Sequence, residues 1–135
     1  MNWSGDALVA RIRQAAMRGV VRGTEVVHTA AIRAIQTGPK TGRVYRRRGV
    51  SHQASAPGEA PASDTGALVQ RSSTRYEPND LRGVVSFHAA YAALLEFGTT
   101  RMEPRPFLRP ALVASRDQIL ADVAAEIRRE FEAMG

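Results

Sequence analysis

The sequence predicts an α+β domain, and three observations lead to this fold class. Apolar residues recur at helical spacing near both ends of the chain, over about residues 4–36 and 110–133. Between them, two runs that contain β-branched and aromatic residues flank the turn-forming EPND at 77–80, which predicts an antiparallel hairpin. With 135 residues, the chain is expected to form a single domain over residues 1–135.

The first helix is predicted from an apolar stripe and from the residues at its two ends. The stripe consists of Leu8, Ile12, Ala15, Gly19, Val26, Ala30 and Ala34. Ser4 is expected to be the N-cap, and Trp3 before it is expected to pack onto Leu8. Gly38 and Pro39 are expected to end the helix, since glycine accepts a left-handed C-terminal position and proline cannot continue a helix.

Two glycines, Gly19 and Gly23, lie inside this predicted helix. Each weakens a helix interior by about 1 kcal/mol relative to alanine. They either allow another backbone to approach closely or mark a tolerated kink, and the sequence leaves both interpretations open.

An extended, flexible arm is predicted over about residues 38–66. The stretch RVYRRRGVSHQASAPGEAP is first basic and then rich in Pro, Ala, Ser and Gly, with too few large apolar side chains to pack as helix or strand. A structureless stretch longer than about 12–15 residues in a compact domain is usually functional or disordered. The candidate contact residues of this arm are Lys40, Arg43, Tyr45, Arg46, Arg47 and Arg48.

The second half of the chain predicts the hairpin, a short helix, a strap and a final helix. The hairpin strands are expected in ALVQRSSTRY and LRGVVSFHAA, and AYAALLEFG is expected to form a short helix that stops at Gly98. Three prolines within 104–110 predict a stiff, extended strap that Phe107 and Leu108 anchor. Pro110 suits the first position of the last helix. The expected stripe of that helix is Leu112, Ile119, Val123, Ile127, Phe131 and Met134.

No pattern of catalytic or metal-binding residues stands out, so we expect neither an enzyme nor a cofactor. His28, His52 and His88 are far apart in the sequence, without an HExxH motif or paired carboxylates. The neighbours Ser51 and His52 do not by themselves indicate a nucleophile and base. The segment GPKTG at 38–42 departs from the phosphate-loop pattern, and the absence of cysteine excludes disulfides and thiolate metal sites.

Glu96 lies in an apolar run, close in sequence to Arg101 and Arg105. A carboxylate there is either a catalytic acid with a raised pKa or the partner of an arginine across a fold or subunit contact. The second interpretation is favoured, because no other catalytic group accompanies Glu96.

The charge distribution suggests an anionic partner. The formal net charge is +6, and residues 1–58 contain ten Arg or Lys against only Asp6 and Glu25. A basic face of this kind meets nucleic acid or an acidic protein surface. No run of 18 apolar residues is present, and the first residues lack the apolar core of a signal peptide, so we expect no membrane contact and no secretion.

Three motifs together resemble a known family. PGEAPASDTG at 57–66, YAALLEFGT at 91–99 and RPFLRPAL at 105–112 are similar, in order and spacing, to small neck proteins of long-tailed phages, described as putative tail components or tail-completion proteins. The resemblance extends over most of the chain. It implies a structural virion protein without an active site, which forms a homo-oligomeric ring, a hexamer, that joins the DNA-filled head to the tail.

This resemblance also implies partners and a location. The ring would assemble in the bacterial cytoplasm and lie in the virion neck, between the head-closure protein and the tail-tube or terminator protein, with its exact level left open. The arm is expected first to clasp a neighbouring subunit, and second to contact genomic DNA in the channel. The candidate packing or interface anchors are Trp3, Tyr91, Glu96, Phe97, Arg105, Phe107 and Leu108.

Two other function classes remain open. A nonspecific nucleic-acid-binding module is supported by charge alone and requires strongly salt-dependent binding of the monomer to any duplex. A small hydrolase requires an activity that is lost when His52 or His88 is changed.

Overall fold

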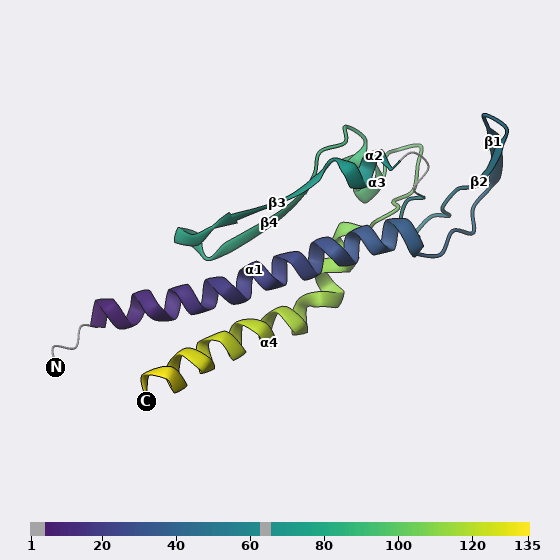
Figure 1. Cartoon of the computed structure of the whole chain (residues 1–135). Coiled ribbons are helices and arrows are strands. Elements are labelled where there is room, and N and C mark those ends of the chain that lie inside the picture. The colour runs from purple at the N-terminus through teal and green to yellow at the C-terminus, as the bar shows by residue number, and fades with distance from the viewer. Residues whose placement is uncertain (1–4, 63–65) are drawn as a thin grey trace.

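The computed structural model describes residues 5–62 and 66–135, and it has the predicted α+β fold (Figure 1). Trp3 and Ser4, the expected staple and N-cap, lie outside these residues. The elements are α1 (Gly5–Thr37), β1 (Val44–Arg47), β2 (Val50–Gln53), α2 (Ala67–Gln70), β3 (Ser72–Glu77), the 3₁₀ turn η1 (Pro78–Asp80), β4 (Arg82–Phe87), α3 (Ala92–Phe97) and α4 (Leu108–Met134).

The two long helices, α1 and α4, run side by side in opposite directions (Figure 1). A Cβ atom added to Gly19 would lie 2.5 Å from the Cα of Val123, so α4 approaches α1 too closely for any other residue there. A Cβ added to Gly23 would lie 2.9 Å from the Ile119 side chain. Close backbone approach is therefore the correct interpretation for Gly19, whereas Gly23 makes room for the side chain of Ile119.

Ion pairs join α1 to the C-terminal half of α4. Glu126, only 4% exposed, accepts Arg18 Nε at 3.1 Å and Arg22 Nη2 at 3.0 Å. Glu130 accepts Arg11 Nε at 2.7 Å and Arg18 Nη2 at 3.2 Å. The hydrogen bond from Arg18 is the main reason why the pKa of Glu126 lies below its ordinary value, although burial acts in the opposite direction.

The β3–β4 ribbon lies along α1, with Ser72 opposite Phe87 and Glu77 opposite Arg82. This confirms the predicted hairpin around EPND, with η1 at its turn. The strand expected from residue 67 begins only at Ser72, because Ala67–Gln70 forms a helical turn instead. Gly66, in the left-handed region, starts this turn, and its carbonyl accepts the N–H of Gln70 at 3.0 Å.

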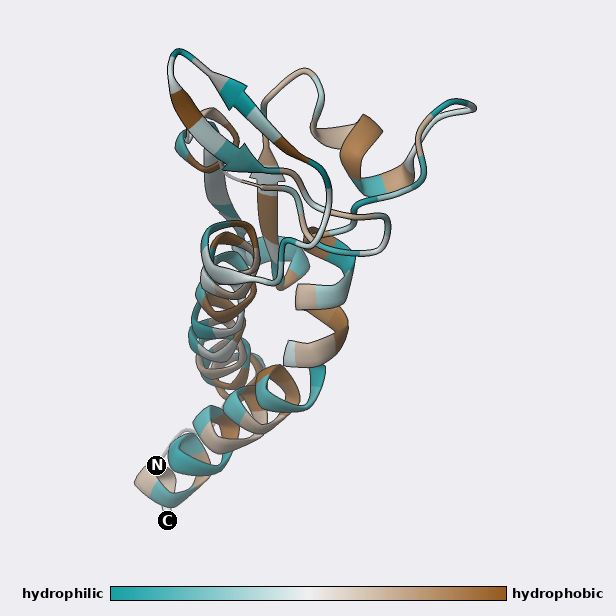
Figure 2. Ribbon diagram, turned by 90° about the vertical axis from the view of Figure 1, so that its right-hand side faces the viewer, coloured by the Kyte–Doolittle hydropathy of each residue, from teal (hydrophilic) through white to brown (hydrophobic). Residues whose placement is uncertain are grey.

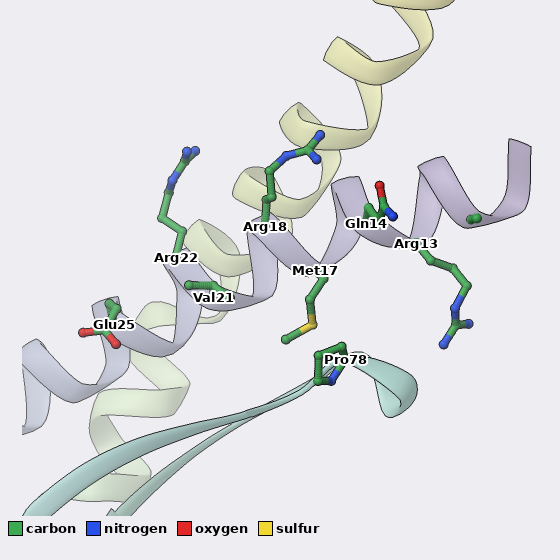
Figure 3. Close-up of a pocket in the computed structure, with 9 residues that line it drawn as sticks. Arg13, Gln14, Met17, Arg18, Val21, Arg22, Glu25 and Pro78 are labelled. Atoms are coloured by element: carbon green, nitrogen blue, oxygen red, sulfur yellow. The ribbon is translucent and has the colours of Figure 1, made fainter. Parts of the chain in front are cut away.

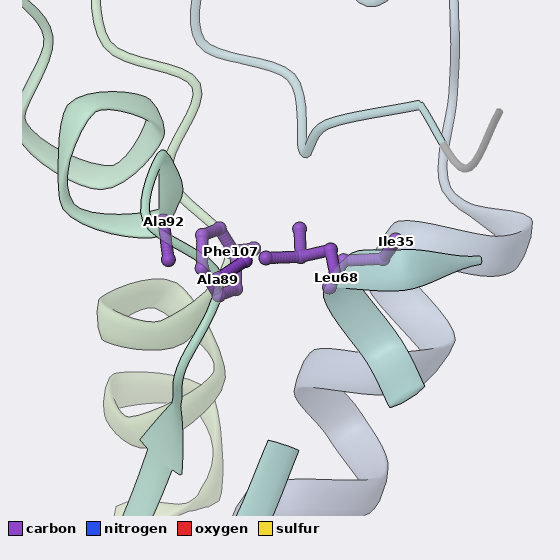
Figure 4. Packing of buried hydrophobic residues seen from close by; sticks show 5 residues of the cluster. All are labelled: Ile35, Leu68, Ala89, Ala92 and Phe107. Atoms are coloured by element: carbon purple, nitrogen blue, oxygen red, sulfur yellow. The ribbon is translucent and has the colours of Figure 1, made fainter. Parts of the chain in front are cut away.

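A small core holds the ribbon, the strap and the end of α1 together (Figure 4). It consists of Ile35, Leu68, Ala89, Ala92 and Phe107. The ring of Phe107 is 2% exposed and meets Phe87 edge to face at 4.8 Å between ring centroids. Leu108 packs against this cluster. Phe107 and Leu108 therefore anchor the strap to the domain, as predicted.

Both long helices differ from the predictions at one end. Gly38 ends α1 without adopting a positive φ, so the expected left-handed cap is wrong; a Cβ there would instead collide with the Ala34 carbonyl. The last helix begins at Leu108, which makes Pro110 its third residue rather than its first. Leu112 and Phe131, expected on its buried stripe, are more than half exposed. Within the described ranges, no helix is both long and apolar enough to cross a lipid bilayer.

Replacing Gly19 by alanine should destabilise the fold by about 1–3 kcal/mol, because the new methyl group forces α4 away from α1. Gly5→Ala is the matched control, since nothing lies within 4 Å of a Cβ at that helical position. Urea unfolding of both variants measures the difference. Equal stability of the two variants would contradict the close contact.

Glu126→Gln should reduce the loss of stability in acid. Because the pKa of Glu126 is lower in the folded than in the unfolded state, its ionisation favours folding above the unfolded pKa of about 4.3. This contribution disappears as the pH falls from there through the folded pKa. Unfolding measured at several pH values should show a shallower acid dependence for Glu126→Gln than for Glu132→Gln, which removes an exposed carboxylate from the same helix. Parallel pH curves would show that the cluster does not stabilise the helix pair.

Candidate assembly interface

Glu96 forms the cap of α4. Its carboxylate accepts the backbone N–H groups of Phe107 at 2.9 Å, Leu108 at 3.0 Å and Arg109 at 2.7 Å. Pro110 has no N–H, so Glu96 satisfies the amides at the start of this helix. Within the described residues no arginine pairs with Glu96, whose acceptor positions face the helix end instead, where a negative charge is favourable. A pairing across a subunit contact stays a prediction.

The strap is fixed at both sides by backbone hydrogen bonds. The N–H of Arg105 donates to the Leu95 carbonyl at 2.7 Å, and the N–H of Gly58 donates to the Pro104 carbonyl at 3.0 Å. The side chain of Arg105 reaches the buried Ser55, whose carbonyl accepts Nε at 3.2 Å. Arg105 thus ties the strap to the base of the arm.

An exposed apolar surface lies where α3 meets the start of α4. We call it the α3–α4 apolar face, formed by Leu94, Phe97, Leu112 and Val113. Phe97 is 75% and Val113 67% exposed, and both line a hollow of about 420 Å³. Phe97 and Leu112 also line a second hollow of about 440 Å³ beside β4. A large aromatic side chain this exposed on a rigid base is a feature of binding surfaces.

Tyr91 and Phe97, two of the predicted anchors, belong to neither hydrophobic core cluster of the described structure. Tyr91 is 43% exposed and precedes α3, one turn from Leu94. Both residues therefore remain candidates for contacts with a partner, and not for packing within the described part of this chain. The hydropathy colours of Figure 2 show brown segments on α4 that alternate with teal, rather than one continuous buried stripe.

A third hollow lies between α1 and the tip of the β3–β4 ribbon (Figure 3). This α1–ribbon groove measures about 990 Å³, and Met17, Val21 and Pro78 form its apolar part. Arg13 closes one end, since its Nη2 donates to the Asn79 carbonyl at 2.6 Å. Arg18 and Arg22 also line the groove, and both bond Glu126.

The base of the arm is closed by hydrogen bonds. Lys40 Nζ donates to the carbonyls of Ala34 at 3.1 Å and Ala60 at 2.7 Å, and burial lowers its pKa. Glu59 accepts the N–H of Thr41 at 2.8 Å and its hydroxyl at 2.5 Å, and this hydroxyl is the main reason why the pKa of Glu59 is lowered. Lys40 thus closes the end of α1 and does not point outward with the arginines.

Beyond this base, the arm forms a second β-hairpin, which the sequence analysis did not expect. β1 and β2 pair antiparallel, with Tyr45 opposite His52 and Arg46 opposite Ser51. Arg48 and Gly49 both have positive φ, 53° and 80°, as a two-residue type I′ turn requires. The rings of Tyr45 and His52 stack at 5.6 Å. Turn geometry and ring stacking thus form strands where apolar packing is scarce.

Two serine–histidine pairs occur in the fold. Ser73 Oγ and His88 Nε2 are 2.7 Å apart, and Ser72 Oγ and His28 Nε2 are 2.8 Å apart. The described partners of His88 include no carboxylate that would orient it as a base. In the part of the chain that is described, no group of three metal-ligating side chains comes together.

Neither a protein-family model, nor a curated protein, nor a solved structure matches this chain.

Sequence reasoning missed the α3–α4 apolar face, although one signal was available. Leu112 and Val113 are neighbours in a helix, as are Ile119 and Leu120. Successive helical residues point about 100° apart, so these pairs widen the apolar surface of the helix beyond the single stripe that the prediction followed. Paired apolar residues in α4 therefore indicate a second apolar surface.

Glu96→Ala should destabilise the fold by about 0.5–2 kcal/mol, the usual cost of losing a helix cap, since three amides lose their acceptor. Glu96→Gln should lose less, because its side-chain oxygen still accepts. Glu103→Ala, at an exposed carboxylate of the strap, is the control. Urea unfolding that gives the same stability for Glu96→Ala and Glu103→Ala would rule out the cap.

Proposed function

We propose that this chain is a structural virion protein of the neck of a tailed phage or phage-like particle, which forms a homo-oligomeric ring between head and tail. The α3–α4 apolar face carries the assembly part of this proposal. The three sequence motifs that resemble neck proteins supply the kind of assembly. Two of the three, at 91–99 and 105–112, contain residues of this face or of the hollows beside it.

The surface area of the subunit supports assembly with copies of itself. Its accessible surface is 9114 Å², whereas a compact monomer of 14.7 kDa exposes about 6,900 Å². The excess of about 2,200 Å² exceeds two standard interfaces of about 800 Å² per partner. A ring needs two different faces on each subunit, because each copy contacts one neighbour on either side.

The α3–α4 apolar face is one of these two faces in the proposed ring. The α1–ribbon groove, with Met17, Val21 and Pro78, is the complementary one, since it offers an apolar hollow on another side of the subunit. A neighbour's Phe97 in this groove would remove the most exposed aromatic side chain of the described surface from water. The neighbours above and below the ring are proposed to be head-closure and tail-tube or terminator proteins.

The basic hairpin supports a second candidate function, a nonspecific nucleic-acid-binding module. Its charge is compatible with either function, whereas an exposed apolar face has no use in a monomeric DNA-binding module. The neck protein is therefore the preferred proposal.

The double variant Phe97→Ser, Val113→Ser should prevent ring formation while the subunit stays folded, because both side chains are exposed in the monomer. The control is Val9→Ser. Val9 is also an exposed apolar residue, and it lies near the N-terminal end of α1. Native mass spectrometry should show wild type and Val9→Ser at six times the 14.7-kDa subunit mass and the double variant as monomer.

In a phage that carries this gene, the double variant should accumulate DNA-filled heads without tails. A wild-type chain that stays monomeric at all concentrations, or normal particles with the double variant, would contradict the proposal. Genes for portal, capsid and tail-tube proteins are expected beside the gene of this chain.

A further inference from the structure

The β1–β2 hairpin concentrates positive charge on a ribbon that stands away from the helices (Figure 1). Between Thr41 and Gly58, the sequence holds four arginines and no acidic residue. Arg43, Arg46 and Arg48 are all exposed. A ribbon that projects at about 3.3 Å per residue from Gly42 to Arg48 is roughly 20 Å long.

Arg43, Arg46 and Arg48 have no anionic partner in the described structure. Arg46 Nη2 donates only to the Gly49 carbonyl, at 3.2 Å, and no described carboxylate pairs with Arg43 or Arg48. Glu59, the nearest acid in sequence, is occupied by Thr41 and the Ala56 amide. This contrasts with α1, where Arg11, Arg18 and Arg22 are all paired with glutamates.

The turn places a cation at the outermost point of the ribbon. Arg48 occupies a position of the type I′ turn where φ is positive, which asparagine or glycine adopts more easily. Local turn stability therefore does not explain an arginine there, whereas a charge-based contact at the tip does.

The surface chemistry of the hairpin favours a polyanion over a protein partner. By alternation, one face bears Val44, Arg46, Ser51 and Gln53, and the other face bears Tyr45, Val50 and His52. Neither face is a continuous apolar patch, so the hairpin offers a partner positive charge rather than apolar area.

We propose that the β1–β2 hairpin is a ribbon that binds the phosphate backbone of double-stranded DNA. The major groove is about 12 Å wide and admits a two-stranded β-ribbon, so a hairpin of this length brings its arginines to the phosphates of both groove walls. Contact with phosphates makes the binding independent of sequence and dependent on salt. This inference does not require the proposed ring, and a DNA channel is one setting in which such a ribbon would act.

The test measures binding of the full-length chain to a labelled 30-base-pair duplex by fluorescence anisotropy at several salt concentrations. The hairpin variant is Arg46→Gln, Arg48→Asn, which removes two charges and leaves Asn before Gly49, the preferred sequence of a type I′ turn. Its matched control is Arg116→Gln, Arg128→Gln, which removes two exposed arginines from α4. A third variant, Arg46→Lys, Arg48→Lys, keeps the charge.

The hairpin variant should bind roughly tenfold more weakly for each arginine at 0.1 M salt, and the slope of log K against log salt should fall by about 2. The control and the lysine variant should keep a slope close to that of the wild type.

No duplex binding by the wild type at low salt, or equal losses in the hairpin variant and the control, would overturn the inference. An unchanged DNA slope together with weaker self-association of the hairpin variant would assign the hairpin to a protein contact instead. A chain that binds DNA through the hairpin but forms no ring would refute the proposed function and leave this inference intact.

Discussion

The close contact between α1 and α4 is the constraint on which the rest of the structure depends. Because Gly19 allows the backbone of Val123 so near, large side chains are excluded from the contact. Four of the six buried apolar residues of α1 and α4 are alanines, so this helix pair buries little apolar volume. The arginine–glutamate cluster around Glu126 adds the directional interactions that a wider, leucine-filled helix pair does not need. The ribbon then lies along α1, with its turn beside Arg13, and the strap and the arm attach near the C-terminal end of this helix.

Glu96 links this helix pair to the exposed apolar surface. One carboxylate fixes the start of α4, the end of the strap and the orientation of α3, from which it projects. Phe107 enters the core at the capped end, whereas Phe97 follows Glu96 directly and turns outward. The same local geometry thus buries Phe107 in the core and leaves Phe97 exposed, where a partner can contact it. A flexible strap would not hold Phe97 and Val113 close enough to form a common surface.

The sequence was sufficient for features that local interactions determine. The extent of α1, the turn at EPND and the stop at Gly98 all follow from local sequence patterns, although Gly38 does not form the predicted left-handed cap. The acceptor role of Glu96 could not be predicted from the sequence. Its three N–H donors lie 11 to 13 residues further along the chain, and only the folded strap brings them to the carboxylate. The β1–β2 hairpin was missed for a different reason: apolar content was taken as the requirement for strands, whereas Arg48 and Gly49 form this ribbon by turn geometry. Leu112 was misplaced because periodicity identifies an apolar side of a helix without saying whether it meets the core or a partner.

The sparse core and the two kinds of exposed surface have a common physical origin. A chain of this length that places its large apolar residues on the surface gives up folding stability, and it regains that stability only when the surface is covered. The α3–α4 apolar face is chemically suited to a protein partner, because covering Phe97 and Val113 removes apolar area from water and buries no charged group. The hairpin is suited to a polyanion, since burying Arg46 and Arg48 against an apolar partner would leave their charges unpaired. These surfaces lie on different elements, with the hairpin projecting beyond the helices, so a subunit held by its neighbours through α3 and α4 keeps its arginines accessible.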